Sequence, residues 1–307
     1  MDFKDTKLLF ELVNEYNEIL KKEYIHSGNC SNEDDFPYSE KHPHYFKQKK
    51  FDNIIRGMSK ETYNEYSRGL GHELEPLGKD APPKFISVAS SALFCYTKLE
   101  VDKTSNKKEG ADFFSIDDDR ITDVEFEKKL VINENLINGK HPYMDAYAIT
   151  NNREYFFECK CQEFFFEKDT KIAKSYFGLD KDLIVKYIPK EFLHENKTNY
   201  EIDEKLFGVE NSLFNYKQLL THLMGIVSNK KRDNSVFIYY YQFPSEKYVD
   251  DEDIKEVIFK AINDTIIVFE SKIIKEYCKK HSIELQLWMT DKYDLKTASK
   301  NNTVRVF

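Results

Sequence analysis

Apolar residues recur at helical spacing in several parts of the chain. They predict helices over Asp5–Lys22, Leu213–Val227 and Asp253–Lys280, each with one apolar face. The run Lys84–Leu99 is apolar throughout and rich in small residues, so it predicts a buried helix. The polar stretch Ser27–Pro43 separates the first helix from the remainder and is the best candidate for a linker.

Shorter apolar and aromatic runs predict strands. They are Asp123–Ile132, Tyr143–Ile149, Glu154–Phe165, Ser235–Phe243 and Ile283–Met289. The first three follow one another and form a meander. The last two flank the long predicted helix, so they should lie parallel in a βαβ unit with a right-handed crossover. The pattern therefore predicts an α/β (α+β) fold, with a mixed β-sheet that contains a three-strand meander and is flanked by helices.

Charged residues interrupt the predicted hairpin at three positions. Asn151–Asn152 suits a two-residue turn, because Asn tolerates positive φ, and this register places Asp145 opposite Glu158. Glu158 and Lys160 share a face because successive strand residues alternate. Two carboxylates placed opposite each other repel, and a cation between them would relieve that repulsion. Oxygen ligands with room for water suit Mg²⁺ or Mn²⁺ rather than zinc.

Such a site suits phosphodiester hydrolysis, in which a metal activates water and stabilises charge on the phosphate. Lys160 would hold a water or neutralise a developing anion. Two other interpretations stay open. Acids and lysines also alternate on ordinary solvated hairpins, and two carboxylates about 5 Å apart also suit a retaining glycosidase. In a glycosidase, however, Lys160 has no evident role.

Composition narrows the class of protein. Hydrophobic residues make up 40% of the 307 residues and aromatic residues 15%, which is enough for a core in one large domain or two small ones. A net charge of −8 argues against a general nucleic-acid coat, but not against a local basic cleft. No apolar run reaches the roughly 20 residues of a membrane helix. The acidic N-terminus has no secretory pattern, so we expect a cytoplasmic protein with no membrane partner and reduced cysteines.

Two other groups of residues give little support to further chemistry. The glycines after Arg68 lack the lysine of a phosphate-binding loop, so we expect no nucleotide cofactor. Gln218 and His222 are four residues apart and share a helix face. We interpret that face as solvated, with a cleft border as the alternative. His222 is not expected to act as a base, because the sequence offers it no orienting partner.

The stretch MDAYAITNNREYFFECK resembles the PD-(D/E)xK nuclease superfamily, with Asp145 as the acid of one strand and Glu158-Cys159-Lys160 as the E-x-K of the next. The chain departs from the pattern at Met144, which stands where the Pro of the Pro-Asp dipeptide is common. A wider run is similar to uncharacterised bacterial restriction endonucleases of that superfamily. The resemblance covers roughly residues 69–289. It includes GHEL, PPK, SSAL and FEKKL before the hairpin and QLLTHLMG after it.

The resemblance implies a fold and an activity. It implies a restriction-endonuclease-like core in residues 61–307, with residues 1–60 as a helical N-terminal extension. The implied activity is metal-dependent hydrolysis of DNA phosphodiester bonds, related to restriction or defence. The partners would be DNA and, for double-strand cleavage, a second copy of the chain. The alternative is a nucleic-acid or protein-binding module that uses the same fold without catalysis.

The resemblance also assigns roles to residues. Asp145, Glu158 and the backbone carbonyl of Cys159 would hold Mg²⁺ or Mn²⁺, and Lys160 would position the attacking water.

Further acids often join such sites, and Glu73 and Glu127 are the candidates here. Glu127 is the better placed, on the strand beside Asp145, although both also fit as surface acids. Gln162 continues the face of Glu158 and Lys160 and is a candidate for phosphate contact or a polar strand end.

Overall fold

A computed structural model describes most of the chain. The described residues are 6–26, 35–69, 72–78, 80–105, 115–116, 119–132, 141–166, 169–174, 193–196, 198–209, 212–290 and 304–306. No helix in these ranges combines the length and the apolar character that crossing a membrane requires.

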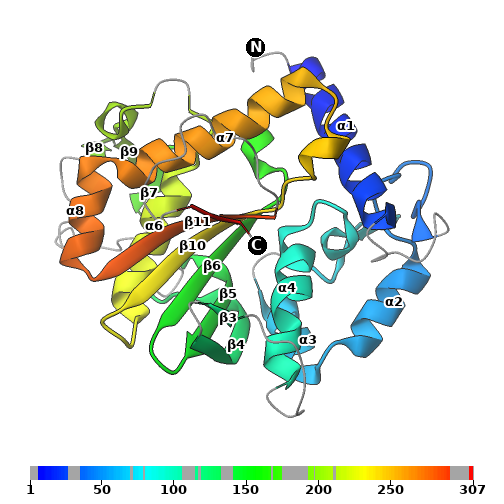
Figure 1. The fold of residues 1–307 in the computed structure, drawn as a ribbon, viewed down its shortest axis with the longest axis horizontal. Helices are drawn as coiled ribbons and strands as arrows, with labels where there is room; N and C mark the ends of the chain where they lie inside the picture. Colours follow the sequence, from blue (N-terminus) through cyan, green and yellow to red (C-terminus); the bar gives the residue numbers. More distant parts are fainter. Residues whose placement is uncertain are drawn as a thin grey trace.

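A seven-stranded mixed sheet lies at the centre of the molecule (Figure 1). Its spatial order is β12 (Val304–Val306), β11 (Ile283–Met289), β10 (Ser235–Tyr241), β6 (Glu154–Lys160), β5 (Tyr143–Thr150), β4 (Asp119–Lys129) and β3 (Ser115–Ile116). Strands β3 to β6 pair antiparallel, whereas β6, β10, β11 and β12 pair parallel. The predicted mixed sheet with a three-strand meander, β4–β5–β6, is confirmed.

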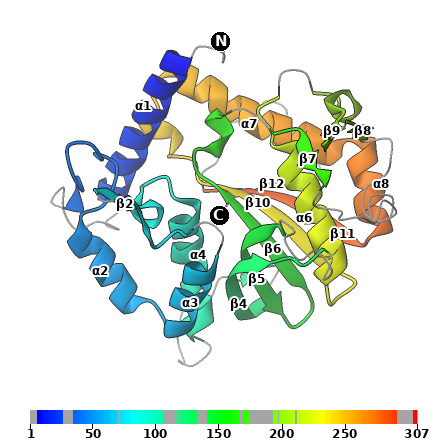
Figure 2. The same cartoon turned by 180° about the vertical axis from the view of Figure 1, so that it is seen from behind.

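Helices cover both faces of this sheet, as Figures 1 and 2 show from opposite sides. The helices of the described residues are α1 (Thr6–His26), α2 (Gln48–Gly57), α3 (Lys60–Arg68), α4 (Ser91–Ser105), α6 (Tyr216–Asn229), α7 (Glu252–Glu270) and α8 (Lys272–Lys280), of which α2 lies at the periphery. Phe94 of α4 packs on Tyr240, while His222 of α6 packs on Phe237. Residues 237 and 240 point to opposite faces, so α4 and α6 sandwich the centre of the sheet. Every residue of β6 and β10 is buried for this reason.

Short strands and single helical turns complete the described structure. β1 (Pro76–Gly78) pairs with β2 (Ala81–Pro83), and a separate three-stranded sheet has the order β7 (Lys171–Ala173), β9 (Asn199–Ile202), β8 (Leu193–Glu195). Single 3-10 turns cover Lys84–Ile86, Glu163–Phe165, Glu204–Phe207 and Glu246–Tyr248.

The hairpin register follows the prediction. Ile149 pairs with Glu154, and the Thr150 N–H donates to the Arg153 carbonyl at 3.0 Å, which closes a two-residue turn at Asn151–Asn152. The antiparallel pairs run from this turn to Ala146–Phe157 and end there, one pair before Asp145 and Glu158. The two acids therefore lie where the strands stop pairing.

Three predicted elements differ substantially from the structure, whereas the ends of the others shift by four residues or fewer. The single helix over Asp253–Lys280 is wrong: extended backbone at Ser271 (φ −58°, ψ 139°) ends α7, and α8 begins afresh. The predicted helix Lys84–Leu99 is a 3-10 turn followed by α4, which starts late because the Ser90 hydroxyl accepts the N–H of Leu93.

The third difference concerns the strand predicted over Glu154–Phe165, which ends at Lys160. Beyond it, the Glu163 carboxylate accepts the N–H groups of Cys161 and Gln162 and turns the chain. The last two predicted strands are β10 and β11. They lie side by side and parallel, with α7 and α8 between them in the chain, as expected.

The N-terminal helix packs on the rest of the chain. Tyr16 is fully buried, and its hydroxyl donates to the Gln242 carbonyl at 2.7 Å. Asn17 donates to the side-chain oxygen of Gln162 at 3.1 Å. The predicted linker lies partly outside the described residues, at 27–34. The division into 1–60 and 61–307 stays a prediction.

Candidate active site

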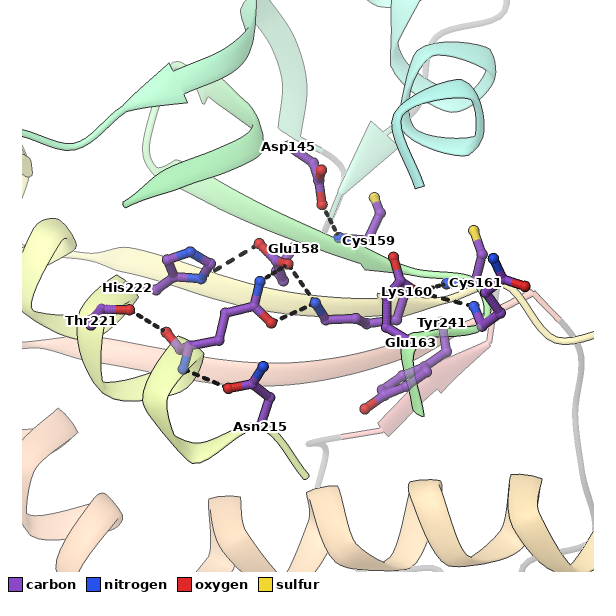
Figure 3. A network of polar contacts seen from close by, with 12 residues as sticks. Asp145, Glu158, Cys159, Lys160, Cys161, Glu163, Asn215, Thr221, His222 and Tyr241 are labelled. Atoms are coloured by element: carbon purple, nitrogen blue, oxygen red, sulfur yellow. Dashed lines mark hydrogen bonds and ion pairs between the residues drawn. The ribbon is translucent and has the colours of Figure 1, made fainter. Parts of the chain in front are cut away.

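A buried ion pair occupies the end of β6. Lys160 Nζ lies 2.6 Å from Glu158 Oε1, and the two residues are 7% and 4% exposed (Figure 3). The predicted shared face is confirmed, because strand alternation places both side chains toward α6. Burying such a pair costs several kcal/mol of desolvation per ion, and only good geometry offsets it.

Gln218, on the first turn of α6, completes the geometry of this pair. Its Nε2 donates to Glu158 Oε1 at 2.5 Å, and its Oε1 accepts from Lys160 Nζ at 2.6 Å. The side chain of Asn215 caps α6 by accepting the N–H of Gln218 at 2.9 Å, which fixes this turn of the helix. An acid, a cation and an amide thus form a closed ring of hydrogen bonds.

His222 lies one helical turn further along α6. Its Nδ1 is 3.4 Å from Glu158 Oε2, and the side chain is almost fully buried. Burial, with Lys160 adding to it, lowers the pKa of His222 to about 3, so the imidazole is neutral at pH 7. The interpretation of Gln218 and His222 as a solvated face is wrong, because α6 covers the sheet at this point. The four-residue spacing of Gln218 and His222 was the sequence signal that both side chains lie on the same face of α6.

The Asp145 carboxylate accepts a backbone hydrogen bond from β6. The Cys159 N–H donates to Asp145 Oδ2 at 2.6 Å, just beyond the last backbone pair of β5 and β6 (Figure 3). Burial raises the pKa of Asp145 well above its ordinary value, and the charges of Glu158 and Glu127 raise it further. Lys160 and the Cys159 amide oppose this shift. The charge of Glu158 thus acts on Asp145, while the direct opposition of the two carboxylates stays a prediction.

Burial also raises the pKa of Glu158, although Lys160 and Gln218 oppose this. For Lys160, burial by itself would lower the pKa. The charges of Glu158 and Glu163 outweigh burial, so the ammonium stays protonated with a pKa above its ordinary value. The site therefore combines a permanent cation with carboxyls that hold protons more tightly than usual.

Glu127 lies on β4 beside Asp145, as predicted. Its neighbours Phe126 and Lys128 pair with Ala146 and Met144, which places Glu127 opposite Asp145. Its φ of 49° is in the left-handed region, an uncommon conformation for a non-glycine residue that clusters at functional sites. Burial raises its pKa to about 8, and the charges of Glu73 and Glu158 contribute.

Gly69, at the end of α3, makes room for the Glu127 side chain. A Cβ at this position would collide with the Glu127 carboxylate. This glycine lies two residues before the GHEL motif, and the close approach of Glu127 explains why position 69 carries no side chain.

The two other predicted residues lie further from the ring of hydrogen bonds. Glu73 is half-buried, and burial raises its pKa, with Lys84 opposing and Glu163 adding to the shift. Its link to the site is its charge, which acts on Glu127. Gln162 follows the end of β6 and accepts from Asn17, so the strand face does not extend to it. Its phosphate contact stays a prediction.

A pocket of about 330 Å³ opens beside the site. Glu127, His141, Lys217, Gln218 and His222 are among the residues that line it. Lys217 Nζ forms an ion pair with Asp169 at 2.5 Å on its rim. Gln218 and Glu127 therefore lie between the buried ion pair and solvent.

The carboxylates suit a hard divalent cation. In the described residues, no three Asp, Glu, His or Cys side chains are grouped closely enough to hold a metal ion. Mg²⁺ commonly binds through one or two carboxylates and keeps several waters, so Asp145 and Glu158 are the residues that would hold it. Burial is the main cause of both raised pKa values, and the charges of Glu158 and Glu127 add to the shift of Asp145, a repulsion that a bound cation would relieve.

Comparison with known proteins adds no relative. No family model matches the chain, and neither the curated proteins nor the solved structures include a match.

Proposed function

We propose that this protein is a metal-dependent endonuclease that hydrolyses DNA phosphodiester bonds. The observation that carries the proposal is the buried Lys160–Glu158 pair at the end of β6, beside Asp145. Apolar residues of similar volume would stabilise such a position as well as an ion pair does. Charges kept there, with perturbed pKa values and next to a pocket, indicate chemistry rather than stability.

Each residue has a role that its contacts support. Asp145 and Glu158 would hold Mg²⁺ or Mn²⁺, and the Cys159 amide orients Asp145. A bound divalent ion supplies Lewis-acid stabilisation of the phosphate and acidifies a water. Lys160 keeps its proton and neutralises charge on the attacked phosphate, while Gln218 fixes its direction. Glu127, with a pKa of about 8, can exchange a proton near neutral pH.

DNA as the substrate, a restriction or defence role and the restriction-endonuclease-like core all depend on the resemblance of the D…E-x-K hairpin. The order β4–β5–β6 with Asp145 and Glu158 on neighbouring strands agrees with that resemblance.

Cleavage of supercoiled plasmid and mixed linear DNA tests the proposal, with Mg²⁺, Mn²⁺ or EDTA. We expect nicking that needs the metal and is lost in Lys160→Ala, because the alanine removes the ammonium beside Glu158. Lys272→Ala, an exposed lysine on α8, is the matched control and should cleave like the wild type. Cleavage by Lys160→Ala at the wild-type rate would contradict the role of Lys160.

One observation favours the alternative, a binding module without catalysis. Glu158 Oε1 is already engaged by Lys160 and Gln218, and its Oε2 faces His222. Such a ring is stable without a metal. Calorimetry with Mn²⁺ separates the two functions: the nuclease predicts binding that Asp145→Ala abolishes, whereas the module predicts DNA binding with no metal binding and no cleavage.

A further inference from the structure

A second cavity, of about 550 Å³, lies apart from the candidate active site. Residues of α1, α2 and α4 line it together with those that follow β10 and β11. Its volume falls in the range of small-molecule sites, roughly 300–1,000 Å³. Parallel strands end at this edge of the sheet, where ligands bind in many open α/β sheets.

Aromatic rings form much of its wall. They are Tyr24, Phe46, Phe94, Tyr96 and Phe243. The three phenylalanines are buried and the two tyrosines are half-buried, so the cavity has an apolar floor and an amphipathic rim. Faces of aromatic side chains stack on planar heterocycles such as nucleobases, largely without regard to which base it is.

The charged residues at the rim favour one sign of charge on the ligand. Lys50 and Lys98 both line the cavity, and Lys50 pairs with Asp35 at 3.5 Å. Lys98 Nζ lies 6.0 Å from the centre of the Phe94 ring, and the charge of Glu23, which also lines the cavity, acts on it. Glu23, the acid of the lining, accepts the Ser245 N–H at 3.1 Å. The lining thus carries two ammonium groups and one carboxylate, an excess of positive charge that favours an anionic ligand over a quaternary amine.

The floor offers polar groups for a heterocycle. Gln242 is buried, and its Nε2 makes one long contact, at 3.4 Å, with the Tyr24 hydroxyl. The amide therefore keeps donor capacity toward the cavity. The Oε1 atom of Gln242 accepts from the Cys161 thiol. The backbone N–H of Gln242 donates to the Lys160 carbonyl at 2.7 Å. The cavity is thus joined to the end of β6 by one residue.

We propose that this cavity binds a nucleoside phosphate, with the base against the aromatic wall and the phosphate at Lys98 and Lys50. Aromatic rings, an amide donor for the base edge and two ammonium groups against one carboxylate occur together in this lining. The same chemistry is offered by a free mononucleotide and by an unstacked nucleotide of a single strand. The inference does not depend on nuclease activity.

Calorimetry and thermal unfolding in EDTA test the proposal. The probes are the common nucleoside monophosphates, the matching nucleosides and a short single-stranded oligonucleotide. We expect monophosphates at up to about 1 mM to bind and to raise the melting temperature, and nucleosides to bind at least about tenfold more weakly. If only the oligonucleotide binds, the source is a strand; if the free monophosphate suffices, the source is a small molecule.

Variants locate the binding. Lys98→Ala should weaken it about tenfold or more, Lys98→Arg should retain it, and the exposed control Lys272→Ala should leave it unchanged. Asp145→Asn should also retain it, which separates this cavity from the candidate active site. Absence of binding by every probe overturns the proposal. So does binding that survives Lys98→Ala but is lost in Asp145→Asn.

Discussion

At the residue scale, the site consists of a few polar groups whose directions are fixed by one another. Glu158 accepts from Lys160 and Gln218, and Asp145 accepts from the Cys159 amide. Each carboxylate is held by a neutral or cationic donor, so the side chains are oriented before any substrate arrives. This preorganisation is what positioned catalytic groups need.

Gln218→Ala tests the ring. Loss of the amide frees both Glu158 and Lys160 to rotate, and removal of an orienting partner typically costs about 10–100-fold in activity. We expect a loss of that size in the rate of DNA cleavage, with the fold intact by circular dichroism. Gln48→Ala on the exposed side of α2 is the control. A Gln218→Ala rate equal to that of Gln48→Ala would show that the ring has no functional role.

Glu127→Gln tests the third acid through pH. The carboxyl titrates near 4.5 in its ordinary state and near 8 in the folded protein. Between these values the folded chain holds a proton that the unfolded chain releases, so the free energy of unfolding falls as pH rises, and the penalty is complete above pH 8.

The variant removes this penalty. Without metal, the free energy of unfolding of the variant, relative to that of the wild type, should rise by at least about 1.4 kcal/mol between about pH 5 and about pH 9. Chemical denaturation in EDTA measures the difference, with the exposed Glu276→Gln as control. Parallel stability curves for Glu127→Gln and the wild type would contradict the raised pKa.

At the element scale, three elements converge on the end of β6. α6 supplies Gln218 and His222, and β4 supplies Glu127. α1 contacts the site indirectly, through a hydrogen bond from Tyr16 to Gln242. The Tyr16 hydroxyl donates to the Gln242 carbonyl, while the Gln242 N–H donates to the Lys160 carbonyl. The first helix is therefore linked, through the backbone of one residue, Gln242, to the strand that carries the lysine.

Tyr16→Phe tests this link. It deletes one buried hydroxyl and leaves the Gln242 carbonyl with one partner fewer, which should lower the free energy of unfolding by about 1 kcal/mol. Urea denaturation measures the change. Tyr63→Phe, at a ring that is 43% exposed, is the matched control and should be nearly neutral. Equal effects of the two substitutions would show that the hydrogen bond contributes nothing.

At the scale of the whole molecule, α1 belongs to the same apolar core as the sheet. Leu12, Val13, Tyr16, Ile19 and Leu20 are all buried in it, and Tyr16 packs edge-on against Phe164 and Phe165. A helix that buries five large side chains contributes several kcal/mol, because each fully buried side chain of this kind is worth about 1.5–3 kcal/mol.

Removal of residues 1–34 tests how separable the N-terminal region is. We expect a chain that unfolds at a clearly lower temperature and binds a hydrophobic dye, because the apolar surface beneath α1 becomes exposed. Differential scanning calorimetry measures the first effect. An unchanged melting temperature would support residues 1–60 as an independent extension.

The local pattern was sufficient for the hairpin. Alternation along β5 and β6 and the two asparagines of the turn set the register, since both are properties of neighbouring residues. The register then placed Glu158 and Lys160 on one face and Asp145 and Glu127 on adjacent strands. Helix and strand order followed from periodicity, while the breaks at Ser90 and Ser271 did not, because a single serine competes with the helix only in its tertiary setting.

Only the tertiary structure decided what covers that face. Gln218 is 60 residues from Glu158 in the chain, and no periodicity connects them. The burial that raises the pKa values of Asp145 and Glu127 comes from packed elements, and so does the left-handed backbone at Glu127, next to Gly69. The sequence by itself determined which charges lie on the hairpin, because strand geometry is local. The fold determined that these charges are buried, joined to α6 and next to a pocket, because packing between elements that are distant in the chain is not a local property.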